Sequence, residues 1–193
     1  MIRIATESDV PEILAIYAPY IENTTITFEY DVPCRREFMQ RFLGITAQFP
    51  WLVWEEQGKI LGYAYAAPPY TRAAYRWCAE PSVYLKPEAR GRGIGSKLYA
   101  ALEEILKIQG YQVLYALITQ ENAPSLAFHR KLGYGIRVLF PDCGFKFGRW
   151  LGVYWLEKRL ISVEIPKSFP TPFSQLRQDE QRFSDILYSL SLS

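Results

Sequence analysis

Three glycines at alternate positions, interleaved with two arginines, form the stretch of this sequence best suited to hold a ligand. The run Arg90-Gly91-Arg92-Gly93-Ile94-Gly95 follows a strand-like segment at residues 82–85 and opens a segment with leucine and isoleucine at helical spacing. Glycine lets a backbone approach a ligand closely, and the N–H groups of such a turn and of a helix N-terminus bind phosphate oxygens. The two arginines add positive charge. By spacing alone, the run is equally a phosphate-binding loop or a plain glycine turn.

Two well-known glycine motifs do not fit this run. The dinucleotide-binding pattern needs its last glycine at the position of Ser96. A P-loop needs Gly-Lys-Ser/Thr where Ser96-Lys97-Leu98 stand. If the loop binds phosphate, it therefore binds a different phosphate-bearing cofactor.

Two further side chains could move protons. Glu80 stands in a strand-like run, and a carboxylate there could act as a base or simply face solvent. His129 is the single histidine of the chain and lies in a helical segment, where it could act as an acid or base or only pack. Residue type alone favours a solvent-facing carboxylate for Glu80 and a packing role for His129.

The elements that must position these residues follow a simple order. A strand at residues 2–5 precedes a helix that starts at Asp9 with Glu12 in a capping-box pattern, and a second helix covers residues 35–48. A hairpin at residues 51–66, a long strand at 75–85, a helix from Gly93, a strand at 113–118, a helix from Asn122 and closing strands follow. This order predicts the α/β class, a mixed and mostly antiparallel sheet with helices on both faces. Pro81 within the long strand predicts an edge or a bulge where the ladder opens.

Composition restricts the class of protein. The 193 residues, 49% hydrophobic, suffice for one buried core, and a net charge of +2 without a basic block disfavours a nucleic-acid surface. No apolar run approaches a membrane span, and residues 1–5 begin structure at once, so we expect a cytoplasmic protein. Three cysteines without a Cys-x-x-Cys pair and one histidine predict neither a disulfide framework nor a metal site.

The composition changes near residue 161. Three prolines and several serines follow, which predicts a domain at residues 1–160 and a C-terminal extension at 161–193. A short amphipathic helix there could bury Leu176, Phe183, Ile186, Leu187 and Leu190. We expect this tail to pack on its own domain or to fray rather than to bind a partner.

Several runs between residues 49 and 150 resemble the phosphinothricin acetyltransferase family of the GNAT superfamily. They are Phe49-Pro50-Trp51-Leu52-Val53, Gly62-Tyr63-Ala64-Tyr65-Ala66, Arg72-Ala73-Ala74-Tyr75-Arg76-Trp77, Glu80-Pro81-Ser82-Val83-Tyr84, Arg90-x-x-Gly93-x-Gly95, Asn122-Ala123-Pro124-Ser125-Leu126-Ala127-Phe128-His129, Leu132-Gly133-Tyr134 and Gly144-Phe145-Lys146-Phe147-Gly148-Arg149-Trp150. The resemblance implies a GNAT fold and direct transfer of an acetyl group from acetyl-CoA in a ternary complex. The implied acceptor is the α-amino group of a small amino acid or analogue such as phosphinothricin or methionine sulfone, and the implied assembly is a homodimer.

The same resemblance implies roles for single residues. Glu80 matches the proposed base, and His129 matches a supporting acid or base. The expected cofactor-binding residues are Val83, Tyr84, Leu85, Arg90, Gly91, Arg92, Gly93, Ile94, Gly95, Ser96, Asn122 and Ser125, with an amide of Val83, Tyr84 or Leu85 stabilising the oxyanion. The expected acceptor-binding residues are Phe28, Arg72, Tyr75 and Tyr84, with Arg72 binding a carboxylate. As alternatives, Asn122 could be a plain helix cap and Arg72 a loop charge.

This chain departs from the family pattern at three places. Arg130 follows the histidine where the family has Glu, Tyr70 replaces a second basic residue, and Leu151-Gly152 replaces His-Asp. Two other functions therefore remain open: acetylation of another amine, such as a polyamine or a protein N-terminus, and acyl-CoA binding without turnover. Arg72 disfavours a polyamine, and the joint presence of Glu80, His129 and Arg72 disfavours a protein without turnover.

Overall fold

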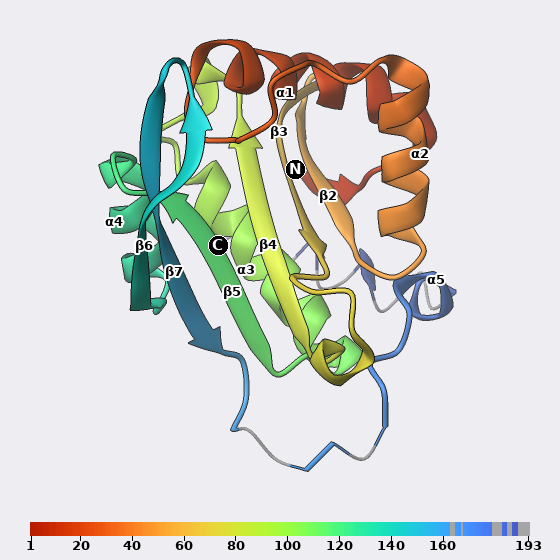
Figure 1. Cartoon of the computed structure of the whole chain (residues 1–193). Helices are drawn as coiled ribbons and strands as arrows, with labels where there is room; N and C mark the ends of the chain where they lie inside the picture. The colour runs from red at the N-terminus through yellow and green to blue at the C-terminus, as the bar shows by residue number, and fades with distance from the viewer. Residues whose placement is uncertain (163–164, 167, 179–182, 185–186, 189–193) are drawn as a thin grey trace.

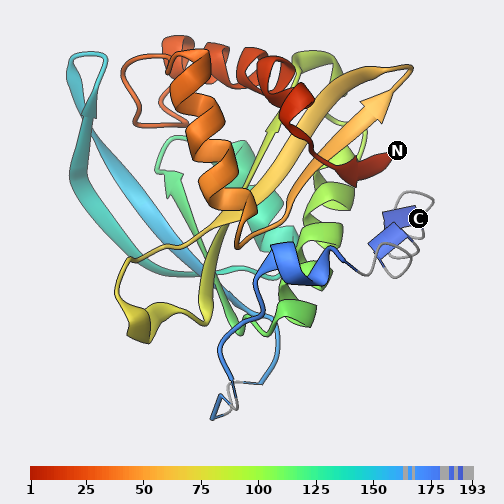
Figure 2. The same ribbon diagram turned by 90° about the vertical axis from the view of Figure 1, so that its right-hand side faces the viewer.

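A seven-stranded sheet with helices on both faces organises the part of the chain that the structure describes (Figures 1 and 2). The structure is a computed structural model, and it describes residues 1–162, 165–166, 168–178, 183–184 and 187–188. The strand order is β1-β2-β3-β4-β5-β7-β6, and only β4 and β5 run parallel. The strands are β1 (Ile2–Ile4), β2 (Trp51–Glu56), β3 (Lys59–Ala67), β4 (Cys78–Leu85), β5 (Val113–Thr119), β6 (Gly135–Lys146) and β7 (Arg149–Arg159). The predicted mixed, mostly antiparallel sheet is confirmed.

Alternating side chains divide the core between the two faces of the sheet. In β2, Trp51 and Val53 point toward α1 (Val10–Asn23) and α2 (Arg35–Thr46), whereas Leu52 and Trp54 join the cluster around α3 (Ile94–Gln109). α4 (Ala123–Lys131) packs on the α3 side (Figure 1). Short helical turns are η1 (Glu7–Asp9), η2 (Ala73–Tyr75), η3 (Pro87–Ala89) and α5 (Phe173–Leu176).

The parallel pair β4–β5 is the weak point of the ladder. The two strands pair only at Cys78 with Val113 and at Ala79 with Leu114. Beyond these pairs β4 continues along β3 and β5 continues along β7, so the sheet opens between them. Pro81 stands two residues past the last pair, so its missing N–H breaks no hydrogen bond between β4 and β5. The opening of the ladder at Pro81 is the one that its position in the sequence predicted.

Part of the C-terminal extension joins the core. Phe173 is 1% exposed, its N–H donates to the Gln48 carbonyl, and its ring lies 5.8 Å from that of Phe183. Gln109 of α3 donates to the carbonyls of Gln48 and Thr171. The helix proposed from sequence falls partly on Ile186 and Leu190, which lie outside the described residues. No helix in the described ranges is long and apolar enough to cross a membrane.

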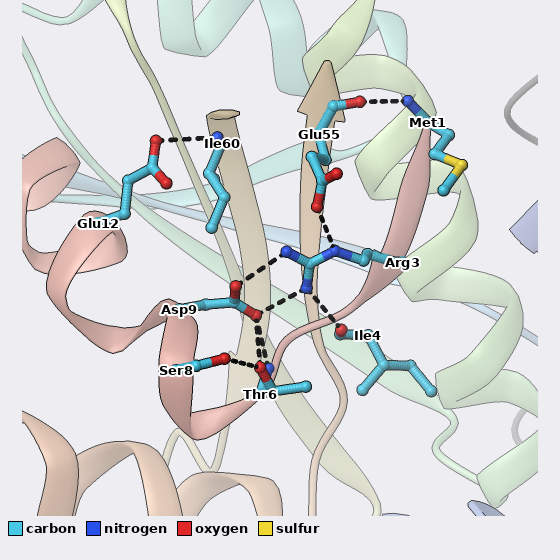
Figure 3. A network of polar contacts seen from close by, with 9 residues as sticks. All are labelled: Met1, Arg3, Ile4, Thr6, Ser8, Asp9, Glu12, Glu55 and Ile60. Carbon is cyan, nitrogen blue, oxygen red and sulfur yellow. Dashed lines mark hydrogen bonds and ion pairs between the residues drawn. The ribbon is translucent and has the colours of Figure 1, made fainter. Parts of the chain in front are cut away.

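A charged network fixes the N-terminal strand to the start of α1 (Figure 3). The Arg3 guanidinium donates to both carboxylate oxygens of Asp9, at 2.7 and 2.8 Å, and to Glu55 of β2 at 2.6 Å. The backbone N–H of Thr6 also donates to Asp9, at 2.7 Å. Burial opposes ionisation of Asp9, but the bonds from Arg3 and Thr6 outweigh it and hold the pKa of Asp9 below its usual value.

This network corrects the predicted capping box. The helix does start at Asp9, but the Asp9 carboxylate turns back to Thr6 and Arg3, and no side chain caps the first turn of α1. Glu12 instead accepts from the Ile60 N–H at 2.9 Å and pairs with Lys86 at 3.1 Å (Figure 3 shows the first of these bonds). Asp9 therefore forms a capping box with Thr6 at the start of η1, one turn earlier than predicted, and Glu12 binds partners from distant strands.

We expect Asp9→Asn to lower the free energy of unfolding by about 2 kcal/mol, between the values for exposed and buried ion pairs. The pKa of Asp9 is lowered in the folded state. Its contribution is therefore complete above the ordinary pKa of an aspartate in an unfolded chain, about 3.9, and disappears as the pH falls through the folded-state pKa. Urea unfolding at pH 7 and at successively lower pH measures this. The exposed Asp31→Asn is the matched control, and an equal loss in both variants would contradict the assignment.

Candidate active site

The opening between β4 and β5 holds two neighbouring cavities that meet at Glu80. The smaller, about 80 Å³, is called the His129 cavity, and the larger, about 440 Å³, the Phe28 cavity. Both include Ile26, Glu80, Ser82, Tyr84 and Leu117. The His129 cavity adds Pro81, Val83, Tyr99, Ala116, Ile118, Asn122, Ser125 and His129, and the Phe28 cavity adds Tyr17, Thr27, Phe28, Tyr65, Thr119, Cys143, Val153 and Trp155.

Glu80 carries a carboxylate prepared to accept a proton. It is half-buried on β4 at the start of the opening, and among the described residues no side chain or backbone group donates to it. Burial raises the pKa of Glu80 above its usual value, because the charged form loses hydration without gaining a partner. A carboxylate with a raised pKa is a stronger base than an exposed one.

The alternation of β4 selects one backbone amide for the opening. Lys86 donates its backbone N–H to the Leu61 carbonyl of β3. Because backbone groups alternate in direction along a strand, the N–H and C=O groups of the even-numbered residues of β4 point to β3, and those of the odd-numbered residues point to the opening. The Leu85 N–H is already bonded to the Tyr20 hydroxyl, at 3.2 Å, and Pro81 has no N–H. Of the three amides considered from sequence, Val83 therefore presents its N–H to the His129 cavity.

The glycine loop forms the N-terminus of α3 beside this opening. Gly91 and Gly93 have φ values of +73° and +78°, and a Cβ at either position would meet nothing within 4 Å. No side chain caps the helix, so its first N–H groups, from Ile94 onward, are available to an anion. Arg90 donates to the Tyr20 hydroxyl at 3.1 Å. Arg92 pairs with Glu56 at 2.7 Å, which offsets the charge it was expected to add.

His129 is buried, at 5% exposure, and its ring is bonded on both sides. Nδ1 lies 2.8 Å from the Ser125 carbonyl, and Nε2 lies 2.9 Å from the Tyr99 hydroxyl. The Tyr99 hydroxyl also lies 2.9 Å from the carbonyl of Pro81, the residue after Glu80. Burial lowers the pKa of His129, and the hydrogen bond to the Ser125 carbonyl partly opposes this. The imidazole is thus fixed in orientation by two helices and β4.

The β6–β7 hairpin holds one wall of the Phe28 cavity in place. Lys146, 2% exposed, donates to the carbonyls of Ile21, Thr24 and Thr27 at 2.8, 2.9 and 2.8 Å. These bonds tie the hairpin to the end of α1 and to the segment that carries Phe28. Gly144 completes this contact, because a Cβ there would lie 2.1 Å from the Phe28 ring.

Arg72 and Tyr75, expected to bind the acceptor, lie in a third cavity of about 770 Å³, here called the Arg72 cavity. No carboxylate of the described residues lines it. Arg72 is exposed, and no described residue pairs with it. Tyr70 forms the partition toward the Phe28 cavity, since its ring lies 4.3 Å from that of Tyr75 and 5.9 Å from that of Trp155. The structure therefore places Arg72 and Glu80 in different cavities.

The remaining expected residues fall on either side of the His129 cavity. Asn122 accepts from the Ser125 N–H at 3.2 Å, so it caps α4 as well as lining the cavity. Tyr84 packs among Tyr17, Tyr20 and Tyr63 and contributes to both cavities. Sequence reasoning missed Tyr99, which has the helical spacing of a core residue, because only the fold shows where its hydroxyl points.

Together these features suit a long ligand with phosphates at one end and a reactive carbonyl at the other. The uncapped glycine loop offers N–H groups to phosphate, and the Val83 N–H offers a donor where a carbonyl oxygen would gain charge. A carboxylate base and a buried imidazole stand in one cavity, and an aromatic cavity opens on the other side of Glu80. This is the geometry of an acyltransferase that uses an acyl thioester.

Comparison with known proteins identifies the same class of enzyme. The family model described as acetyltransferase (GNAT) domain matches residues 2–155, and the chain belongs to this family of acetyl-CoA-dependent acyltransferases. It is 35% identical over 176 residues to a phosphinothricin N-acetyltransferase of Streptomyces viridochromogenes, covering 91% of this chain and 95% of the relative. It is 36% identical over 162 residues to an L-methionine sulfoximine/L-methionine sulfone acetyltransferase of Pseudomonas paraeruginosa, covering 82% and 94%.

Solved structures show the same likeness. A GNAT phosphinothricin acetyltransferase from Sinorhizobium meliloti, in complex with acetyl-CoA, superimposes with a TM-score of 0.83 at 34% identity. The likeness covers 88% of this chain and 94% of that one. These neighbours support acetyl-CoA as the cosubstrate, and the loop geometry described above fits its phosphates.

We expect Gly93→Ala to raise the KM for acetyl-CoA about tenfold, equivalent to about 1.4 kcal/mol, because an alanine strains the left-handed turn that presents the N–H groups. Initial rates over a range of acetyl-CoA concentrations measure this. Gly58→Ala is the matched control: its φ is +75°, its Cβ is also free, and it lies in the β2–β3 turn. A similar KM in both variants would show that the loop does not bind the cosubstrate.

Proposed function

We propose that this enzyme transfers the acetyl group of acetyl-CoA directly, in a ternary complex, to the α-amino group of a small amino acid or analogue of the phosphinothricin or methionine sulfone type. The observation that carries the proposal is the meeting of two cavities at Glu80. One leads past the Val83 amide to His129, and the other is an aromatic cavity of a volume that suits a small molecule. The names of the relatives support this acceptor class.

The chain's own groups account for each proton. Glu80, directly or through a water, takes a proton from the acceptor ammonium, which frees the nitrogen to attack the thioester carbonyl. The Val83 N–H donates to the carbonyl oxygen as it becomes negative. When the carbon–sulfur bond breaks, His129 in its protonated form supplies the proton that the sulfur needs. The attacking nitrogen, which is positively charged after the attack, then gives its second proton to the neutral imidazole, and the proton held by Glu80 passes to solvent. Among the described residues, no group of three or more His, Cys, Asp or Glu is placed to hold a metal ion.

Arg72 is proposed to bind the acceptor carboxylate, although it lies beyond Tyr70 in the neighbouring cavity. It is exposed and unpaired among the described residues, so it is available to an anion. One observation favours a second candidate. The Phe28 cavity is lined by the Glu80 carboxylate and, within the described ranges, by no Arg or Lys, which suits an amine without a carboxylate.

Thiol release from acetyl-CoA against a panel of amines separates the two candidates. We expect release with phosphinothricin or methionine sulfone, and a KM for that acceptor at least about tenfold higher in Arg72→Ala, because a carboxylate loses its charged partner. The exposed Arg36→Ala, on the outside of α2, is the control. Release with spermidine or a short peptide instead would favour the second candidate, and silence across the panel with acetyl-CoA bound would indicate a protein without turnover.

Glu80→Gln should lower kcat by about 10²- to 10⁴-fold, the usual contribution of general acid–base catalysis. A base acts only when deprotonated, so wild-type kcat/KM should fall as the pH decreases through the raised pKa of Glu80. This acid limb should be absent from the residual activity of the variant. Glu22→Gln, exposed on α1, is the matched control. An unchanged acid limb in Glu80→Gln would remove Glu80 from the mechanism.

We also propose a homodimer in the cytoplasm, where acetyl-CoA is made and used. β6 is a 12-residue strand at the end of the sheet, and its hairpin exposes Phe145, Phe147 and Trp150 by 45, 56 and 62%. A long edge strand beside exposed aromatic rings is suited to pairing with a second copy. Light scattering should give twice the chain mass for the wild type and the single mass for Trp150→Ser. The control is Leu43→Ser, which changes an exposed apolar residue on α2 and should keep twice the chain mass. A wild-type monomer would contradict the proposal.

A further inference from the structure

The hydrogen bonds around His129 form a chain that ends in a backbone carbonyl on each side. It runs from the Ser125 carbonyl to Nδ1, from Nε2 to the Tyr99 hydroxyl, and from that hydroxyl to the Pro81 carbonyl, at 2.8, 2.9 and 2.9 Å. A carbonyl only accepts hydrogen bonds. Three contacts between two terminal acceptors therefore need three protons.

A neutral imidazole and a tyrosine together have only two protons to place. If Nδ1 is protonated, it donates to Ser125 and the Tyr99 hydroxyl must donate to Nε2, which leaves the Pro81 carbonyl facing an oxygen without a proton. If Nε2 is protonated, Tyr99 can donate to Pro81, but the bare Nδ1 then faces the Ser125 carbonyl. The Ser125 hydroxyl, 3.3 Å from Nδ1, does not remove that repulsion. Only the imidazolium completes all three bonds.

We propose that Tyr99 is a positioning residue that sets the protonation state of His129 by making the hydrogen-bond chain complete only when the imidazole carries its second proton. Burial acts in the opposite sense, since it disfavours the charged ring. Tyr99 thereby opposes the effect of burial and favours the protonated imidazole. The carbonyl of Pro81, the residue after Glu80, accepts the last hydrogen bond of this chain.

Other ionisable groups around the ring do not offer this control. The Tyr134 ring packs edge-on against His129 at 5.2 Å, but its hydroxyl donates to Glu103, which also pairs with Lys158. Glu80 lines the same cavity without a bond to the ring. Arg130 and Lys131, on the same helix, are exposed. Among the described side chains that face the imidazole, Tyr99 is the one bonded to Nε2.

The test uses the fact that the chain has a single histidine, so its imidazole signals need no assignment. Nitrogen-15 NMR of the whole protein, without substrate, follows both ring nitrogens as the pH changes. We expect Tyr99→Phe to move the titration midpoint to lower pH and to leave the neutral ring protonated on Nδ1. Tyr134→Phe is the matched control, because it removes the other neighbouring hydroxyl and keeps the ring contact, and its midpoint should match the wild type.

Activity gives a second measurement, which rests on the proposed function. An acid acts only when protonated, so the alkaline limb of kcat should move to lower pH in Tyr99→Phe, with kcat about tenfold lower and the KM for acetyl-CoA retained. An NMR midpoint unchanged in Tyr99→Phe, or shifted equally in Tyr134→Phe, would overturn the inference whatever the activity. If Tyr99→Phe does not fold, the wild type alone decides: a ring that remains neutral with its proton on Nε2 from about pH 5 to 8, the range in which a histidine ordinarily titrates, would overturn it.

Discussion

The pairing of β4 with β5 for only two residues is the constraint on which the site depends. A longer ladder would bond the amide of Val83 and the carbonyl of Pro81 to a neighbouring strand. Because the strands separate after Ala79, these backbone groups face a cavity instead. The same separation lets Tyr99 reach in from α3 and lets His129 approach from α4. A local loss of sheet bonding thus creates the polar surface that the chemistry needs, while β3 and β7 hold the two strands apart.

Burial acts on the two ionisable groups of this opening in complementary ways. It raises the pKa of the Glu80 carboxyl and lowers that of the His129 imidazole, because in each case the charged form is the one that loses hydration. The pKa values of a carboxylate and an imidazole, which differ widely in water, are therefore brought closer together. This narrows the pH range in which the carboxylate is deprotonated while the imidazole is protonated. Among the described residues, neither group has an ion-pair partner that would prevent the adjustment.

Much of this arrangement could be predicted from local patterns, and the remainder depends on contacts distant in sequence. The hairpin turn at Gln57-Gly58, the glycine start of α3 and the opening at Pro81 follow from backbone chemistry that is visible within a few residues. The partners of a carboxylate are not fixed by local pattern alone: Asp9 caps the turn at Thr6 and also binds Arg3, and Glu12 binds Ile60 and Lys86. The separation of Arg72 from Glu80 likewise depends on how Tyr70 packs.

Lys146 determines when during folding the wall of the Phe28 cavity forms, as well as the geometry of that wall. Its three acceptors lie 119 to 125 positions earlier in the chain. Contacts of such sequence separation form after most of the chain-ordering entropy has been lost, so the segment carrying Phe28 gains its final shape only when the last hairpin docks. During synthesis, the first third of the chain leaves the ribosome with this wall unfinished. The N-terminal part of the nascent protein therefore reaches its final shape only after one of the last segments to be synthesised has folded.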